Sequence, residues 1–334
     1  MWASACPEYH YIVPGLEQAV QLFKPTVEQY PSLSRLLSRV KPQSVINNPY
    51  RLIAQLCNLV LLEDQDFPLA ALLAKQQLQH HFPENSYWIQ AVPVQLIADR
   101  DRLLLRKPSL PIGLTLQEQE RLANQMLNHF ADRFKQVLVT KNDGWLFELQ
   151  AAANIRTVNH ECASESPLDQ MMPQGRDKAT WDLVINEIQM MLHMHHGEQA
   201  IFNSLWFENN GCLPDKSNTV SNCLHTEECS MRALGEFLDC PVTESVETCI
   251  DSGKFSKVIK YDDALNQALL NQSVTDSESS LRRVDQHISD LFSHLKTKKI
   301  SSINFYPANG LQFQFTGRDF YKFWLRNLPV EKRL

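Results

Sequence analysis

The chain has 334 residues, with 32 Lys and Arg against 38 Asp and Glu and a formal net charge of −6. Hydrophobic residues make up 43% and charged residues 21%, which is typical of a globular chain of roughly two domains. The acidic balance argues against binding to nucleic acid or to an anionic membrane. We therefore expect neither nucleic acid nor membrane among its partners.

Glycine spacing excludes three well-known motifs. The ten glycines lie at least seven residues apart. The dinucleotide-binding fingerprint needs glycines two and three apart, and the Walker loop needs them five apart. The nucleophile elbow of hydrolases needs two glycines four apart. The sequence contains none of these motifs.

Cysteine usage and the absence of a targeting pattern indicate the cytoplasm. The eight cysteines form no Cys-x-x-Cys pair and are too sparse for a disulfide scaffold. Residues 1–8 lack the basic start and apolar stretch of a signal peptide. The longest apolar stretch, residues 52–62, is too short to span a bilayer. We expect free thiols in a reducing cytoplasm.

The first elements alternate between strand and helix. A strand at 9–13 is followed by predicted helices at about 16–23, 32–40 and 50–62, and another helix opens at Phe67-Pro68. Strands at 87–97 and 103–105 precede a helix that begins with the capping box Thr115-x-x-Glu118. Strands at 137–139 and 145–147 flank Asn142-Asp143-Gly144, which predicts a hairpin.

The second half begins with residues 154–177, which we expect to form a loop. A helix at 178–195, a buried strand at 202–207 and a polar loop at 208–228 follow. A helix over 275–295 and a hairpin of 300–306 with 311–316, joined through Asn309-Gly310, come next. The aromatic turn at 320–324 is expected to dock on the body.

These elements predict an α/β body that carries a smaller domain. Helices and strands alternate in the first and last thirds of the chain, whereas the pattern between 87 and 150 is that of a compact α+β unit. We assign residues 1–84 and 178–334 to the body, and residues 85–177 to an inserted α+β domain.

Polar residues on the apolar helix 178–195 are the first candidates for ligand binding. Asn186, Glu187 and Gln189 lie on this helix, and a buried Glu187 would need a partner such as Arg156 or Arg176. Such burial could be purely structural, but polar groups on a core helix beside a loop also build anion pockets. The pattern leaves both interpretations open.

Three further positions are ambiguous in the same way. Arg100 and Arg102 flank Asp101 at a strand turn, where a salt-bridged turn is the simpler interpretation. Asn203, at the start of a core strand, could bond either backbone or ligand. His193 and His196, three residues apart, could share a metal ion, but histidines are also favoured at the end of a helix by its dipole.

Three of these stretches together resemble a known family. Residues 98–105, residues 186–193 (Asn-Glu-Ile-Gln-Met-Met-Leu-His) and residues 203–206 (Asn-Ser-Leu-Trp) resemble the proteobacterial regulatory proteins of the RpfE type (regulation of pathogenicity factors). That family is often labelled a cofactor-independent phosphoglycerate mutase. The resemblance runs from roughly residue 45 to 325 and is strongest across 85–215.

The mutase label implies a distant tie to the alkaline-phosphatase superfamily, and hence a three-layer α/β body. Enzymes of that type hold two divalent metals with Asp and His side chains and use a Ser that accepts the phosphoryl group. The metals neutralise the phosphoryl charge, and the Ser divides the transfer into two in-line steps.

This sequence departs from the pattern at the metal centre. Pro14-Gly15-Leu16 follows the first strand, where an Asp ligand is expected. Asn48-Pro49-Tyr50-Arg51 occupies the position expected for the nucleophile, and the chain has no Asp-His dipeptide. We therefore predict a mutase-like scaffold that has lost two-metal phosphoryl transfer and needs no cofactor or metal.

Our first hypothesis is a regulatory or ligand-sensing protein for a small phosphorylated or carboxylated metabolite. Its pocket would lie between helix 178–195, turn 98–105 and strand 203–206. The predicted ligand-binding residues are Arg100, Arg102, Asn186, Glu187, Gln189, His193 and Asn203. The alternative is an active metal-dependent mutase or phosphatase that uses the histidines at 193–196. A third possibility is a protein-interaction scaffold whose surface patch involves residues 320–324.

Overall fold

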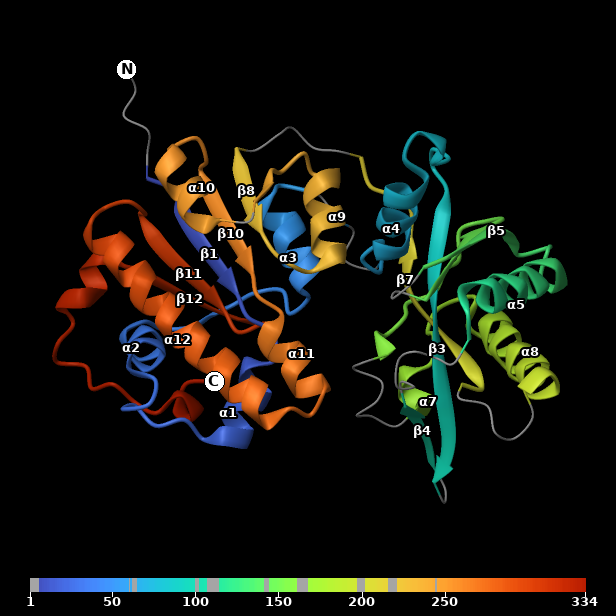
Figure 1. Ribbon diagram of the computed structural model, residues 1–334, viewed down its shortest axis with the longest axis horizontal. Helices are drawn as coiled ribbons and strands as arrows, with labels where there is room; N and C mark the ends of the chain where they lie inside the picture. Colours follow the sequence, from blue (N-terminus) through green and yellow to red (C-terminus); the bar gives the residue numbers. More distant parts are fainter. Residues whose placement is uncertain are drawn as a thin grey trace. The chain divides into compact units, whose positions relative to one another are not determined.

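Figure 1 shows the computed structural model, in which the chain divides into two compact units. The described residues are 6–59, 61, 65–99, 102–106, 114–140, 144–160, 168–196, 202–215, 221–243 and 245–334. Unit 1 comprises Met1–Val60 and Lys216–Leu334, and unit 2 comprises Leu61–Asp215. Unit 2 is therefore inserted into unit 1 in the sequence.

Within its described residues, unit 1 contains a seven-stranded sheet in the order β2-β12-β11-β1-β10-β8-β9. The central strands β11, β1, β10 and β8 are parallel to one another. Strand β12 pairs antiparallel with β11, and β2 pairs antiparallel with β12. The strands are β1 (Glu8–Ile12), β2 (Gln43–Ser44), β8 (Asn222–His225), β9 (Val242–Thr243), β10 (Lys257–Tyr261), β11 (Ser302–Tyr306) and β12 (Leu311–Thr316). Because the central strands are parallel and in register, their amino ends meet at one edge of the sheet.

Helices cover both faces of this sheet. On one face, Tyr9 and Tyr11 of β1 belong to a core shared with α1, α2, α10 and α12. On the other face, Asn222 of β8 bonds the end of α3, and Gly235 of α9 lies against Leu224. The helices are α1 (Leu16–Phe23), α2 (Pro31–Arg39), α3 (Pro49–Leu56), α9 (Cys229–Phe237), α10 (Val246–Ser252), α11 (Ala264–Leu270) and α12 (Val274–Lys296). The predicted α/β body is confirmed.

The long helix α12 illustrates how the sequence builds this core. Ser273 caps its first turn by accepting a hydrogen bond from the Asp276 backbone. Leu281, Val284, Ile288 and further apolar residues recur at helical spacing and are buried against the sheet. The buried Asp285 carboxylate accepts the Leu33 backbone N–H at 2.7 Å, which ties α2 to α12.

The described strands of unit 2 form an antiparallel sheet in the order β4-β3-β6-β5, with β7 also paired to β3. They are β3 (Tyr87–Asp99), β4 (Arg102–Arg106), β5 (Phe134–Val139), β6 (Trp145–Leu149) and β7 (Ser204–Gly211). The helices are α4 (Leu69–Leu78), α5 (Leu116–His129), α7 (Leu168–Met171) and α8 (Lys178–His196). The predicted hairpin and the Thr115 capping box are both present.

The predicted domain boundaries at residues 85 and 177 differ from this division. Strand β7 pairs with β3 between Val94 and Trp88, so it belongs to the sheet of unit 2. Helix α8 packs Trp181 and Ile188 into the same core. These pairings are between residues far apart in the chain, and the local pattern carries no sign of them.

Several local predictions were also wrong. The predicted loop at 208–228 includes the end of β7 and all of β8, and the predicted helix at 50–62 ends at Leu56. A disulfide joins Cys223 of β8 to Cys249 of α10, where free thiols were expected. No helix among the described residues has the length and apolarity needed to cross a membrane.

Candidate ligand-binding cavity

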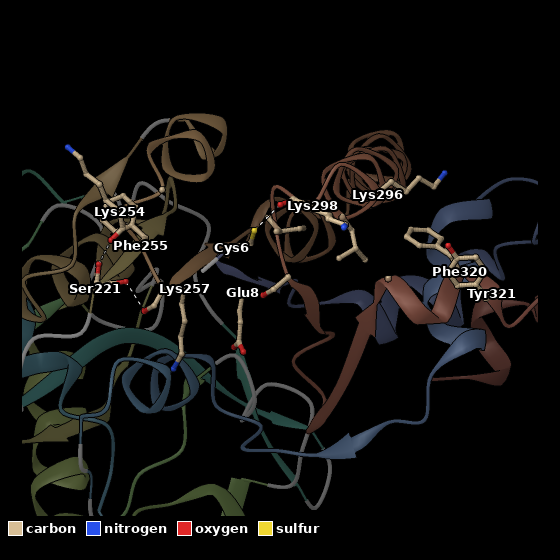
Figure 2. A pocket seen from close by; sticks show the side chains of 16 residues that line it. Cys6, Glu8, Ser221, Lys254, Phe255, Lys257, Lys296, Lys298, Phe320 and Tyr321 are labelled. Carbon is tan, nitrogen blue, oxygen red and sulfur yellow. Dashed lines mark hydrogen bonds between the residues drawn. The ribbon is translucent and has the colours of Figure 1, made fainter. Parts of the chain in front are cut away.

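A cavity of about 1090 Å³ opens at the amino edge of the parallel strands of unit 1 (Figure 2). Glu8 opens β1 and Lys257 opens β10, and these two residues are register partners. The segment after α10, the end of α12 and the short 3-10 helix η3 (Gly317–Tyr321) complete the lining. With Ser221, the lining thus comes from five separate stretches of the chain.

The lining is strongly basic for an acidic protein. Its lining includes four lysines, Lys254, Lys257, Lys296 and Lys298, and a single carboxylate, Glu8. The Lys257 ammonium donates to the Leu56 carbonyl at 2.8 Å, which fixes its position. Among the described residues, the ammonium groups of Lys254, Lys296 and Lys298 have no carboxylate within ion-pair distance.

Glu8 is tied to a buried histidine. His10 Nε2 lies 3.4 Å from Glu8 Oε2, and this contact with His10 holds the pKa of Glu8 below its usual value. Burial lowers the pKa of His10, and its Nδ1 lies 2.9 Å from the Tyr306 hydroxyl. At neutral pH the imidazole is therefore neutral and Glu8 is ionised, so the lysines outnumber the negative charge.

Part of the cavity wall is apolar. Phe255, Leu295, Ile300, Phe320 and Tyr321 contribute it. Lys296 Nζ lies 5.2 Å from the centroid of the Phe320 ring, a cation–π distance (Figure 2). A cavity with an apolar wall and a few cationic groups suits a ligand that combines an anionic group with a hydrocarbon part.

Local backbone geometry positions two of the segments that line the cavity. Gly253 ends α10 with φ 60°, a left-handed conformation that glycine adopts without steric cost, and the chain then turns into Lys254. Thr316 and Asp319 form a capping box that starts η3 and places Phe320 and Tyr321 at the cavity. Both signals are visible in the sequence, but their convergence is not.

The carboxyl edge of the same sheet is where open α/β folds usually bind ligands. Pro14 and Gly15 follow β1 there, and Asp262 follows β10. The Tyr11 hydroxyl donates to Asp262 Oδ2 at 3.0 Å, and Lys260 Nζ lies 3.7 Å from the same oxygen. The carboxylate of Asp262 is therefore already engaged by protein groups.

A buried histidine extends this network. Tyr9 Oη and His287 Nε2 are 2.9 Å apart, and Tyr11 packs edge-on against the same imidazole. Burial, reinforced by the charge of Lys260, lowers the pKa of His287 to about 3, so it is neutral at physiological pH. No group of three or more His, Cys, Asp or Glu side chains among the described residues is arranged to hold a metal ion. The expected absence of a metal stays a prediction.

The ligand residues predicted on α8 are largely exposed. Asn186, Glu187 and His193 are solvent-exposed, and Glu187 Oε2 lies 3.3 Å from His129 Nε2. Glu187 is therefore not buried, and its partner is the exposed His129 where Arg156 or Arg176 was suggested. Gln189 is half-buried, and its amide lies 3.4 Å from the Ser204 hydroxyl at the start of β7.

The other predicted residues lie around strand β3. Asn203 accepts the Leu96 backbone N–H at 2.7 Å and donates to the Leu96 carbonyl at 2.9 Å, so its amide serves as a backbone partner. Arg102 of β4 lies opposite Asp99 of β3 in the backbone register of the two strands. Arg100 lies outside the described residues. Asn203 therefore contacts strand β3, and Gln189 contacts the start of strand β7. The other predicted residues of α8, Asn186, Glu187 and His193, are exposed to solvent.

Sequence reasoning missed the cavity because its residues are dispersed. The lysines are at a helix end, a strand start and a connecting turn, where single lysines are ordinary. The run Lys296-Thr297-Lys298-Lys299 was the one local signal. The other charged residues of the cavity, Glu8 and Lys257, are brought together only by the parallel register of β1 and β10.

Comparisons with known proteins give a likeness of fold. No family model matches the chain, and no curated protein matches it significantly. Among solved structures, the PH0037 protein of Pyrococcus horikoshii is similar with a TM-score of 0.50 and 8% identity, over 95% of this chain and 92% of that one. A cofactor-independent phosphoglycerate mutase from Thermoplasma acidophilum has a TM-score of 0.44 and 12% identity, over 93% and 89%.

At 8% identity the likeness to the Pyrococcus protein concerns the fold alone. It extends over nearly the whole of both chains, so the α/β unit and the inserted unit are both included. The predicted membership of the RpfE-type family is not confirmed by these comparisons.

Proposed function

We propose that this chain is a regulatory protein that senses a small phosphorylated or carboxylated metabolite. Its scaffold would be of the phosphoglycerate-mutase type, with alkaline-phosphatase-like layers, and without two-metal phosphoryl transfer. The observation that carries the proposal is the lysine-lined cavity at the amino edge of unit 1. This location differs from the pocket that the sequence predicted beside α8, which stays a prediction.

The charge of the cavity supports an anionic ligand. Lys254, Lys296 and Lys298 line one cavity, and among the described residues none of their ammonium groups has a carboxylate partner, so each is available to an anion. Lysine is a compact point charge with three donors, and it is a common ligand of phosphate and carboxylate groups. The ionised Glu8 on one side would exclude ligands that carry negative charge at that end.

The carboxyl edge supports the absence of transfer chemistry. Two-metal centres need several carboxylates and imidazoles free to coordinate cations. Here Asp262 is held by Tyr11 and Lys260, and His287 is buried against Tyr9. These contacts are of the kind that stabilise a core, and they support a scaffold role for this edge.

Calorimetric titration tests the proposal. With 3-phosphoglycerate as the probe, we expect one binding event per chain and a rise in Tm that follows mass action. The variant Lys296→Gln/Lys298→Gln should weaken binding at least tenfold. The matched control Lys41→Gln/Lys332→Gln, which changes two exposed lysines elsewhere in unit 1, should leave the affinity unchanged. A broad panel of phosphorylated and carboxylated metabolites then identifies the preferred ligand.

Two results would contradict the proposal. The first is no binding across the panel, or binding that the cavity variant leaves unchanged. The second is stoichiometric metal in the purified protein, with turnover of 3-phosphoglycerate in Mn²⁺ that His193→Ala abolishes. That second result would support the alternative of an active metal-dependent mutase or phosphatase.

A further inference from the structure

Three aromatic rings near the carboxyl end of unit 1 are largely exposed. Tyr321, Phe323 and Trp324 are 75%, 82% and 66% exposed, although the aromatic turn was expected to dock on the body. Phe320 alone follows that expectation, since it packs against Phe292 and Phe315. We call residues 320–326 the aromatic segment.

The segment is firmly attached on both sides of its exposed rings. Before them, the Lys322 ammonium pairs with Asp319 and donates to the Arg39 carbonyl at 3.2 Å. After them, the Leu328 backbone N–H donates to the Ser38 hydroxyl at 2.8 Å. The Phe323 and Trp324 rings contact each other, with centroids 5.4 Å apart. The rings are thus presented to solvent by an anchored backbone.

Positive charge accompanies these rings. The chain has no Asp or Glu from residue 320 to 330, and Arg326 lies within the segment, as does Lys322, whose ammonium is already paired with Asp319. Arg318 is exposed just before it, and Lys296 lies over the Phe320 ring. The carboxylate that precedes the segment, Asp319, is buried, accepts hydrogen bonds from Thr316 and pairs with Lys322. The exposed side chains of residues 318–326 therefore include positive charge and no negative charge, although the whole chain is acidic.

From this combination we infer that the aromatic segment docks on an anionic lipid surface. Trp, Tyr and Phe rings prefer the headgroup region of a bilayer, where their apolar body is buried and their polar edge stays wet. Lysine and arginine beside them gain from the negative surface potential of anionic lipids.

The net charge of −6 argued against an anionic membrane, but it averages over the whole chain. Surface potential falls off within a Debye length of about 8 Å at physiological salt. A bilayer that contacts the aromatic segment therefore interacts with its nearby cations and little with distant carboxylates. This inference does not depend on ligand binding in the cavity.

Vesicle flotation of the full chain tests it. We expect binding to phosphatidylcholine vesicles that contain about one quarter phosphatidylglycerol, with weaker binding as salt rises. Phe323→Ala/Trp324→Ala should reduce the partition coefficient at least tenfold. The control Leu183→Ala/Met190→Ala removes two apolar side chains that are 62% and 66% exposed in unit 2, and it should bind like the wild type.

Three outcomes would overturn the inference. One is an absence of binding to anionic vesicles by the folded wild-type chain. Another is unchanged binding by the Phe323→Ala/Trp324→Ala variant, whose thermal unfolding should match the wild type because both rings are exposed. The last is vesicle-independent self-association that this variant abolishes, measured by sedimentation velocity, because it would assign the segment to a second copy of the chain.

Discussion

Replacing His287 with Gln should make unit 1 less sensitive to acid. Burial, followed by the charge of Lys260, lowers the pKa of His287 from 6.5 to about 3. Below pH 6.5 the unfolded chain takes up a proton at this residue and the folded chain does not, so stability falls as pH falls. The stability that His287 provides is complete above pH 6.5, and its loss continues down to about pH 3.

The size of the effect follows from the two pKa values. Between pH 7.5 and pH 5, the unfolded imidazole becomes almost fully protonated while the folded one stays neutral. The linkage relation then gives a loss of about 2 kcal/mol from His287 alone. A Gln side chain can still accept the Tyr9 hydroxyl, but it does not titrate. The variant should therefore lose about 2 kcal/mol less than the wild type over this range.

Urea unfolding at both pH values measures the difference. A brief deuterium pulse, followed by mass spectrometry of peptides from β1 and α12, confines the signal to unit 1. Other titrating groups, including the buried His10, are shared by both proteins and cancel in the comparison. If the wild type and the variant lose equal stability between pH 7.5 and pH 5, the assignment of a neutral buried His287 is refuted.

Three further changes test unit 2, whose unfolding can be followed by tryptophan fluorescence. Thr115→Ala removes the cap of α5 and should cost about 1 kcal/mol, whereas Thr115→Ser should restore most of it. Asn203→Ala leaves the Leu96 backbone without its two partners and should cost about 1–3 kcal/mol, with no change in 3-phosphoglycerate affinity. Gly144→Ala should destabilise the β5–β6 hairpin, because φ is +79° and the new Cβ would lie 2.5 Å from the Ala91 carbonyl oxygen; a Tm equal to the wild type would contradict this.

Elements whose signals are local were predicted well from the sequence. The helix over 178–195 was found from its apolar spacing, and the hairpin after 300 from Asn309-Gly310. The Thr115 capping box was found because its two residues are three apart. In each of these cases the residues that stabilise the element also lie within it.

Pairings between distant residues were not predictable in this way. Strand β7 was recognised as a strand, but its assignment to unit 2 depends on β3, more than a hundred residues earlier in the chain. Strand β8 was taken for a loop because its four residues, Asn222–His225, carry no clear alternation. Short parallel strands buried between neighbours give little periodic signal.

The candidate residues show the same limit. Asn203 was correctly identified as a hydrogen-bonding position, but the choice between backbone and ligand required the neighbouring strand. The cavity lysines drew no attention singly, because lysine at a helix end or a strand start is common. A site made of dispersed cations becomes recognisable only when the sheet register places them together.

The two edges of the unit 1 sheet can be tested separately, because strand β10 runs from one to the other. Lys257 begins this strand at the cavity, and Asp262 follows its end at the carboxyl edge. Five residues of strand separate the two positions by roughly 16 Å, about twice the Debye length at physiological salt. Asp262→Asn should therefore weaken the contacts with Tyr11 and Lys260, and lower stability, while it changes 3-phosphoglycerate affinity less than about twofold. A loss of affinity as large as that of Lys296→Gln/Lys298→Gln would place the ligand at the carboxyl edge and would contradict the assignment of the cavity.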